Sequence, residues 1–243
     1  MGLAGPAVGM QAMVRIYVTY LFSVAATVAI TGAVVFLSAW TIYYWQAWVM
    51  LAAMFGSYSA AILYSARRRA PGPRQPRKAG RPQVESRTSQ RIAESLVSLG
   101  FVALLVVPGL DHRFDWSSVP FWISLAADLL VVAGLLITYG VRQMALRWSG
   151  GKSETTEAAR DPRMDSTGPH LAVRHPMHAG TLLYQAAMPV ALGSWWGMVV
   201  FAVILPLFLV RIRYEEKLLR QTFPDEYAEF ARRVEYRLVP HVW

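Results

Sequence analysis

The sequence from Ile16 to Ala66 reads IYVTYLFSVAATVAITGAVVFLSAWTIYYWQAWVMLAAMFGSYSAAILYSA and contains no Asp, Glu, Lys, Arg or His. A helix needs roughly 20 apolar residues to cross the hydrocarbon core of a bilayer. The run is long enough for two such helices, which we expect at about Val14–Ala39 and Ile42–Ser65. The aromatic residues between them are typical of a membrane–water interface. This stretch therefore predicts a polytopic membrane protein.

The composition of the whole chain agrees with this class. Of its 243 residues, 55% are hydrophobic and only 16% are charged, and the mean hydropathy is +0.32. These values are too apolar for an ordinary soluble domain of this size. The chain has no cysteine, which excludes disulfides, thiolate metal sites and a cysteine nucleophile. A single Arg15 before the first apolar run is not typical of a cleavable signal peptide, so we expect the first span to be retained.

Most of the basic residues fall into three segments between or after the apolar runs. Of 24 Lys and Arg residues, nine lie in Arg67–Arg91, six in Arg142–Arg174 and seven in Arg211–Arg237. The net charge of +9 could indicate a nucleic-acid partner, but the alternation with apolar runs favours the positive-inside pattern of membrane proteins. We therefore expect the lipid bilayer as partner, no nucleic acid, and both termini in the cytoplasm. The membrane would be the plasma membrane, or the inner membrane in a bacterium.

Three further apolar runs complete the predicted bundle. We predict one span in each of two of them, Ile92–Val107 and Pro120–Met144, and we expect Pro108-Gly109 to end the first. The intervening LDHRFDWSSVP is predicted to be an outside loop. The third run, Ala179–Val210, is short of the roughly 40 residues that two full spans need, so it predicts a short, tilted or partly embedded hairpin. The expected fold is all-α, with about five or six membrane helices.

Several features outside the spans add to this organisation. The proline-rich basic loop 67–90 is expected to be mobile. Pro224, followed by two acidic residues, predicts a break and a new start in the C-terminal cytoplasmic helix. Asp128 falls inside the fourth span, where an acidic side chain indicates either a functional role or a polar neighbour in the bundle. We divide the chain into an N-terminal transmembrane part, 1–146, and a C-terminal part, 147–243, that holds the candidate site.

Polar residues frame the last apolar run at both of its ends. The sequence DPRMDSTGPHLAVRHPMHAG occupies 161–180, and RIRYEE occupies 211–216. Pro176 can begin a helix, and it favours an extended backbone at His175. The start of a helix offers unpaired N–H groups and a partial positive charge to an anion, and Arg174 adds to this field. Arg211 and Glu215 lie four residues apart, on one helical face.

The predicted pocket is therefore bipolar, with an anion site at a helix start and a carboxylate for an amine or a hydroxyl. S-adenosylmethionine carries matching groups, since it has a carboxylate, an ammonium and ribose hydroxyls. Methyl transfer is an in-line displacement, so positioning supplies much of the catalysis. No acid–base triad is required if the acceptor is already a thiolate or a carboxylate.

The same residues carry a family resemblance. The run GPHLAVRHPMHAG, then RIRYEEKLL, then FPDEYAEFARRV resembles the isoprenylcysteine carboxyl methyltransferases. That family belongs to a wider group of membrane methyltransferases that includes phospholipid N-methyltransferases. The resemblance covers about Asp161–Trp243. It implies a cytosol-facing S-adenosylmethionine site under the C-terminal helices and a lipid-side entry for a lipophilic or small thiol, carboxyl or amine acceptor.

The resemblance also implies roles for individual residues. Arg211 and Glu215 would be catalytic, with Arg211 on the acceptor side. The family usually has tyrosine at two positions where this chain has histidine, so the acceptor and the pH dependence can differ. The residues implied to contact the cofactor are Pro162, Arg163, Met164, Asp165, His170, Arg174, His175, Pro176, Met177, His178, Glu215 and Glu216.

Other hypotheses stay open. Three of the five histidines lie within 170–178 and could form a metal site. Five histidines are nevertheless too few for a diiron oxygenase, which needs several histidine boxes, and we predict no metal. Arg211 and Glu215 could form a plain surface ion pair. The chain could also be a non-catalytic protein for ligand sensing or assembly on the same fold, or a membrane reductase on a related scaffold.

Overall fold

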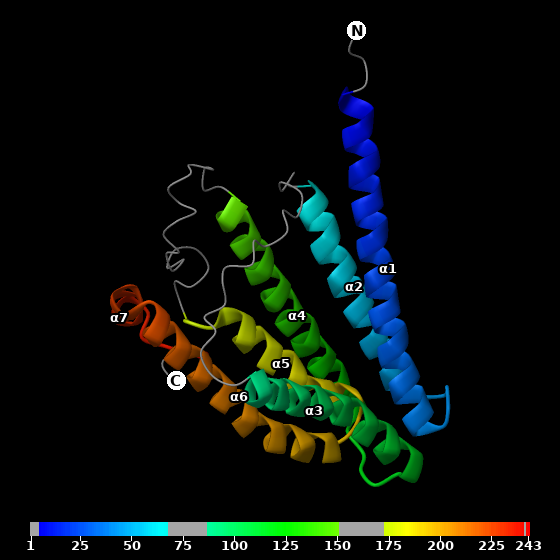
Figure 1. Cartoon of the computed structure of the whole chain (residues 1–243). Coiled ribbons are helices and arrows are strands. Elements are labelled where there is room, and N and C mark those ends of the chain that lie inside the picture. The colour runs from blue at the N-terminus through cyan, green and yellow to red at the C-terminus, as the bar shows by residue number, and fades with distance from the viewer. Residues whose placement is uncertain (1–4, 68–86, 151–172, 241) are drawn as a thin grey trace.

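The computed structural model describes residues 5–67, 87–150, 173–240 and 242–243. Within these ranges the chain forms seven helices and no strand, which confirms the predicted all-α fold (Figure 1). In chain order the helices are α1 (Gly5–Ala39), α2 (Trp45–Arg67), α3 (Arg87–Phe114), α4 (Phe121–Gly150), α5 (Pro176–Ala191), α6 (Trp196–Thr222) and α7 (Pro224–Arg233).

Five of the seven helices in the described ranges are long and apolar enough to cross a membrane, so the protein is a multi-pass membrane protein. The apolar helix α5 is too short to do so. Its 16 residues extend about 24 Å at 1.5 Å per residue, less than the roughly 30 Å of a hydrocarbon core. In the predicted hairpin, α5 is therefore too short to cross the hydrocarbon core, whereas α6 with its 27 residues is long enough. The candidate spans are Val18–Ala39, Trp45–Tyr64, Ser95–Phe114, Phe121–Arg142 and Trp196–Thr222.

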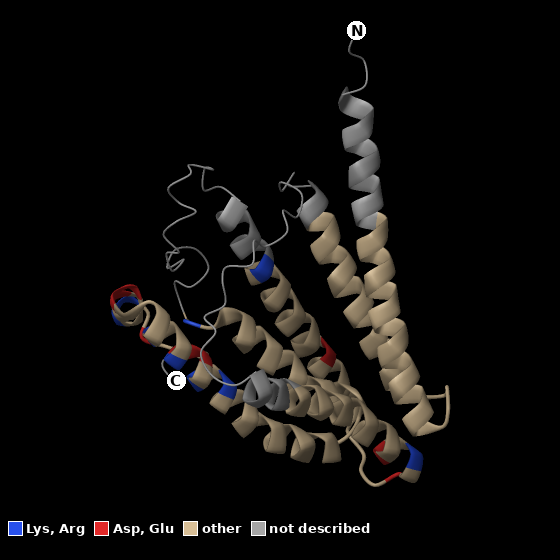
Figure 2. Ribbon diagram, viewed as in Figure 1, with Lys and Arg blue, Asp and Glu red and all other residues tan. Residues whose placement is uncertain are grey.

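Apolar side chains cover the outside of the bundle as well as its core. Val35, Met50, Leu104 and Met188 are almost fully buried between the helices, whereas many large apolar side chains of the spans are exposed. Exposed apolar surface of this extent suits contact with lipid tails. Charged residues instead gather on α7 and the adjoining end of α6, and near the α3–α4 loop (Figure 2).

Helix α5 packs closely against α4, and two glycines make this possible. A Cβ atom added at Gly134 would lie 2.6 Å from the main-chain nitrogen of Tyr184, and one added at Gly180 would lie 2.9 Å from that of Thr138. Small residues at a helix contact let two backbones approach each other. Gly134 of α4 lies beside Tyr184 of α5, and Thr138 of α4 lies beside Gly180 of α5. The residue numbers run in opposite directions, so the two helices are antiparallel. The start of α5 is thereby held beside the later half of α4.

The prediction that Pro108-Gly109 ends the third span is wrong, because α3 continues to Phe114. In a membrane bundle, neighbouring groups can satisfy the backbone that a proline leaves unpaired. The carbonyl that loses its helical partner is that of Leu104, four residues before the proline, while the Tyr44 hydroxyl lies 3.4 Å from the carbonyl oxygen of Pro108 itself. The extra turn carries Asp111, which accepts hydrogen bonds from the Ser117 N–H at 2.8 Å and from the hydroxyls of Ser117 and Ser194. These bonds tie the α5–α6 turn to the α3–α4 loop.

Asp128 is buried in α4, with 5% of its surface exposed. Neither carboxylate oxygen has a hydrogen-bond partner in the part of the chain that the structure describes. The hypothesis of a polar neighbour in the bundle therefore gains no support from the described residues.

The predicted break at Pro224 is confirmed. Helix α6 ends at Thr222, and α7 begins at Pro224 with Asp225 and Glu226 in its first turn. Acidic residues at this position stabilise a helix start through the helix dipole. The apolar face of α7 packs on α6 through a cluster of Tyr227, Phe230, Val234 and Leu219.

Candidate functional site

The start of α5 forms the centre of the candidate site. Pro176 is its first residue, and His175 precedes it with φ −125° and ψ 61°, so the predicted helix start is confirmed. The side chain of His175 does not cap the helix. Within the described ranges, therefore, the first N–H groups of α5 are left available to a ligand, as at other anion-binding helix starts.

A segment from the C-terminal part of the chain holds this helix start in place. The N–H of Arg174 donates to the carbonyl of Tyr236 at 2.8 Å, and the N–H of His175 donates to that of Arg237 at 2.9 Å. The guanidinium of Arg174 donates to the carbonyls of Val234 at 2.7 Å and Ala231 at 3.0 Å. Since these carbonyls lie at the end of α7, Arg174 stabilises that end.

Glu216 joins the same elements through its buried carboxylate, which is 3% exposed. The Nε–H of Arg237 donates to Oε2 at 3.0 Å. The other oxygen, Oε1, lies 3.4 Å from Nη1 of Arg174 and 3.4 Å from Nε2 of His175. A buried charge is tolerated when it is paired in this way. Glu216 thus connects α6, the start of α5 and the C-terminal segment.

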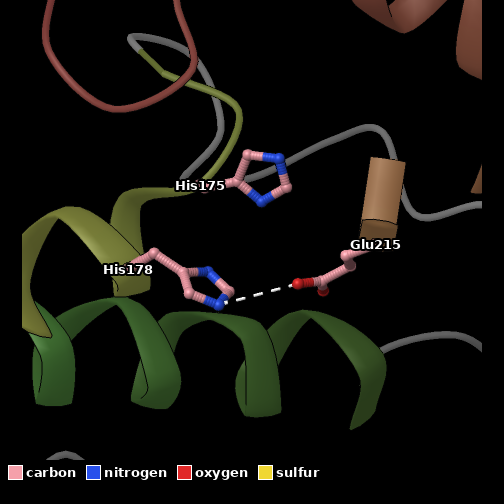
Figure 3. A group of neighbouring side chains, drawn as sticks. All are labelled: His175, His178 and Glu215. Atoms are coloured by element: carbon pink, nitrogen blue, oxygen red, sulfur yellow. Dashed lines mark ion pairs between the residues drawn. The ribbon is translucent and has the colours of Figure 1, made fainter. Parts of the chain in front are cut away.

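Glu215 faces a different direction from its neighbour, because successive residues of a helix are turned by about 100°. Its side chain is 46% exposed, and its Oε2 atom lies 3.6 Å from Nε2 of His178 (Figure 3). The His178 ring packs edge-on against His175 at 5.5 Å and against Phe208 at 5.6 Å between ring centroids.

The surroundings of His178 favour its neutral form. Burial lowers the pKa of His178, and although the Glu215 carboxylate opposes this shift, the positive charge of Arg211 reinforces it. The imidazole is therefore mainly neutral at pH 7 and can offer a nitrogen lone pair. Its contact with Glu215 is correspondingly not a full ion pair at this pH.

The structure brings together some of the residues that the sequence indicated. One potential ligand atom from each of His175, His178 and Glu215 lies within 4.8 Å of the other two. Arg211 is exposed one turn before Glu215 on α6 and is close enough to His178 to act on its charge. Pro176 is buried at the helix start, and Met177 is exposed beside it. Pro162, Arg163, Met164, Asp165 and His170 lie outside the described residues.

Sequence reasoning missed Arg237 and Phe208. Arg237 belongs to no recognisable motif and was counted only as one of seven basic residues near the C-terminus. Phe208 lies in the uncharged run, and in the sequence it cannot be distinguished from an aromatic residue that faces the membrane. No local pattern distinguishes either residue, because both contacts depend on how α6 packs on the start of α5.

Two comparisons with known proteins bear on this region. Residues 123–226 match a family model described as phospholipid methyltransferase. The match runs from α4 into α7 and so contains Arg174, Arg211 and both glutamates. The chain is also 34% identical over 141 residues to Protein-S-isoprenylcysteine O-methyltransferase B of Arabidopsis thaliana. That alignment covers 56% of this chain and 66% of the plant protein, slightly under two thirds of its length.

Proposed function

The chain belongs to the membrane methyltransferases, the group that includes isoprenylcysteine and phospholipid methyltransferases, and on this premise we propose that it transfers a methyl group from S-adenosylmethionine. The acceptor is a lipophilic or small molecule with a thiol, carboxyl or amine group. The proposal rests chiefly on one observation, the opposite charges that the start of α5 and the Glu215 carboxylate present to a single ligand.

The methyl donor suits these two groups. Its carboxylate would bind the N–H groups at the start of α5, where the helix dipole favours negative charge. Its ammonium or a ribose hydroxyl would donate to Glu215, which is half-exposed and 3.6 Å from His178. Hydrogen bonds to a charged carboxylate are among the stronger ones. The rings of His175 and His178 would line the site between these two contacts.

Arg211 is proposed to act on the acceptor. It is exposed on α6, and a guanidinium binds carboxylates and phosphates in a fixed orientation. An acceptor held there would be aligned for in-line displacement at the methyl group, and alignment alone lowers such barriers substantially. The apolar part of a lipophilic acceptor would lie along the exposed side chains of Val203, Leu207 and Val210, which precede Arg211 on the same helix.

The orientation in the membrane follows from the charges. The described basic residues beside the site are Arg174 before α5 and those of Arg211–Arg237, and the positive-inside rule puts such residues in the cytoplasm. We infer that the site opens to the cytoplasm, where S-adenosylmethionine would be available.

Calorimetric titration of S-adenosylmethionine into the protein in lipid nanodiscs tests the proposal. We expect one binding site in the wild type and at least about tenfold weaker binding, or 1.4 kcal/mol, in Glu215→Gln and His175→Ala. Glu229→Gln removes an exposed carboxylate of α7 and should bind like the wild type. Folded wild-type protein that does not bind the donor would refute the proposal.

The acceptor is then identified by transfer of a labelled methyl group. Three probes represent the three acceptor classes: an S-prenylated cysteine derivative, a phosphatidylethanolamine vesicle and a small aliphatic thiol. Transfer to one of them that Arg211→Ala abolishes, while donor binding persists, would support the role of Arg211. Donor binding without transfer to any of the three would favour ligand sensing instead.

A further inference from the structure

We propose that His175, His178 and Glu215 form a binding site for a divalent transition-metal ion such as Zn²⁺. The three side chains come from the start of α5 and from α6, and one potential ligand atom of each lies within 4.8 Å of the other two. Nε2 of His178 and Oε2 of Glu215 are 3.6 Å apart. Figure 3 shows the three side chains directed toward a common space.

These distances suit a tetrahedral ion. Metal–ligand bonds of about 2.0–2.1 Å put neighbouring ligand atoms roughly 3.3–3.4 Å apart. The His178–Glu215 pair is already close to this value, and the remaining atoms need to approach by about an ångström or slightly more. Glu215 can make this adjustment, because its side chain is 46% exposed. The backbone before the two histidines is held by the C-terminal segment, so the adjustment falls on the side chains.

Glu216 supplies the outer-shell contact that metal-binding histidines usually have. Its Oε1 atom lies 3.4 Å from Nε2 of His175, so it can accept the Nε2–H and leave Nδ1 with a lone pair for the metal. In Figure 3 the second ring nitrogen of His175 is on the side of His178 and Glu215. A carboxylate in this position fixes the tautomer and strengthens the histidine as a ligand.

The charges around the three ligands determine which ion fits. Glu216 is neutralised by Arg174 and Arg237, so Glu215 supplies the negative charge of the site. Arg211 places a positive charge near His178, which makes an anionic fourth ligand favourable. Two imidazoles and one carboxylate suit Zn²⁺ or Co²⁺, whereas Mg²⁺ and Ca²⁺ prefer oxygen ligands only.

Such an ion would use residues that we also assign to the methyl donor. The ion and the donor should therefore compete, which makes the metal a reversible inhibitor of donor binding. This consequence rests on the proposed function, whereas metal binding itself does not.

Cobalt titration tests the site directly. Protein without a polyhistidine tag is placed in nanodiscs, stripped with a chelator and titrated with Co²⁺, whose visible absorption is strong only in a tetrahedral site. We expect one ion per chain, displaced by Zn²⁺. His178→Tyr and Glu215→Gln each remove a direct ligand and should weaken Co²⁺ binding by about 100-fold. Loss of a residue that only supports a ligand already costs about 10–100-fold in metal affinity. Glu229→Gln is the matched control and should bind like the wild type.

Wild-type protein without this absorption, or absorption that persists in both variants, would overturn the metal site. If His178→Tyr fails to fold, the exposed Glu215→Gln decides alone. S-adenosylmethionine binding to the metal-free protein is measured separately. Its absence beside intact Co²⁺ binding would refute the proposed function and leave the metal site standing. Donor affinity unchanged by saturating Zn²⁺ would overturn the competition.

Discussion

Glu215 and Glu216 are adjacent in the sequence, yet the structure gives them different tasks. Glu216 is buried among Arg174, His175 and Arg237, whereas Glu215 is half-exposed. We predict that Glu216→Gln strongly destabilises the protein and that Glu215→Gln, the same change one residue earlier, leaves its stability almost unchanged. The pair thus separates a residue that holds the site together from one that is free to bind a ligand.

The magnitude follows from the contacts of Glu216. A hydrogen bond to a charged group contributes about 1.5–3 kcal/mol, and the bond from Arg237 at 3.0 Å is of this kind. The contacts with Arg174 and His175 are longer, at 3.4 Å, and Arg174 keeps its two carbonyl acceptors. We therefore expect about 3 kcal/mol, the lower end for breaking a buried ion pair. At roughly 2–4 °C per kcal/mol for a chain of this size, Tm falls by about 6–12 °C.

Thermal unfolding in nanodiscs, followed by tryptophan fluorescence, measures both variants. Glu215→Gln should change stability by less than about 0.5 kcal/mol, as exposed substitutions usually do, and shift Tm by less than about 2 °C. Equal losses in the two variants, or a Tm for Glu216→Gln within 2 °C of the wild type, would refute the assignment of the buried charge.

The same assay checks three further substitutions. Gly180→Ala should lower the free energy of unfolding by about 1–3 kcal/mol, because the added carbon would lie 2.8 Å from a main-chain oxygen of α4. Gly140→Ala is its control, because an added carbon there has nothing within 4 Å. Equal stability of the two variants would contradict the close packing of α4 and α5. Tyr44→Phe should cost about 1–3 kcal/mol, since it removes a buried donor to the Leu192 carbonyl. Asp111→Ala should cost at least about 3 kcal/mol, because it leaves three donors without their acceptor. A Tm within 2 °C of the wild type for either of the last two would argue against these bonds.

The membrane class and the helix order could be predicted from the sequence, because they depend on the length of apolar runs. The break at Pro224 and the helix start at Pro176 could be predicted too, since proline acts on its immediate neighbours. The error at Pro108 has the same origin. Proline usually ends a helix, but a helix packed in a membrane bundle can contain one, and α3 continues to Phe114.

The arrangement of the site depends on contacts that no local pattern encodes. The resemblance indicated both Glu215 and Glu216 as ligands of the cofactor, and only the rotation of α6 shows which carboxylate is enclosed by arginines. Likewise, Arg174 was expected to add its charge to the helix start, but its side chain reaches carbonyls at the end of α7. The site forms where α6, the start of α5 and the C-terminal segment come together. The sequence gives the residues of each segment but not their contacts.

The bond between Arg174 and the Val234 carbonyl joins residues 60 positions apart, which has a consequence for biogenesis. Ribosomes add about 5–20 residues per second, so the start of α5 emerges roughly 3 to 12 s before the segment that pairs with it. Arg237 follows Glu216 by 21 residues, so for about 1 to 4 s of this interval the Glu216 carboxylate is without Arg237. The membrane helices are therefore inserted first, and the ligand-binding end of the bundle closes as the last step of maturation.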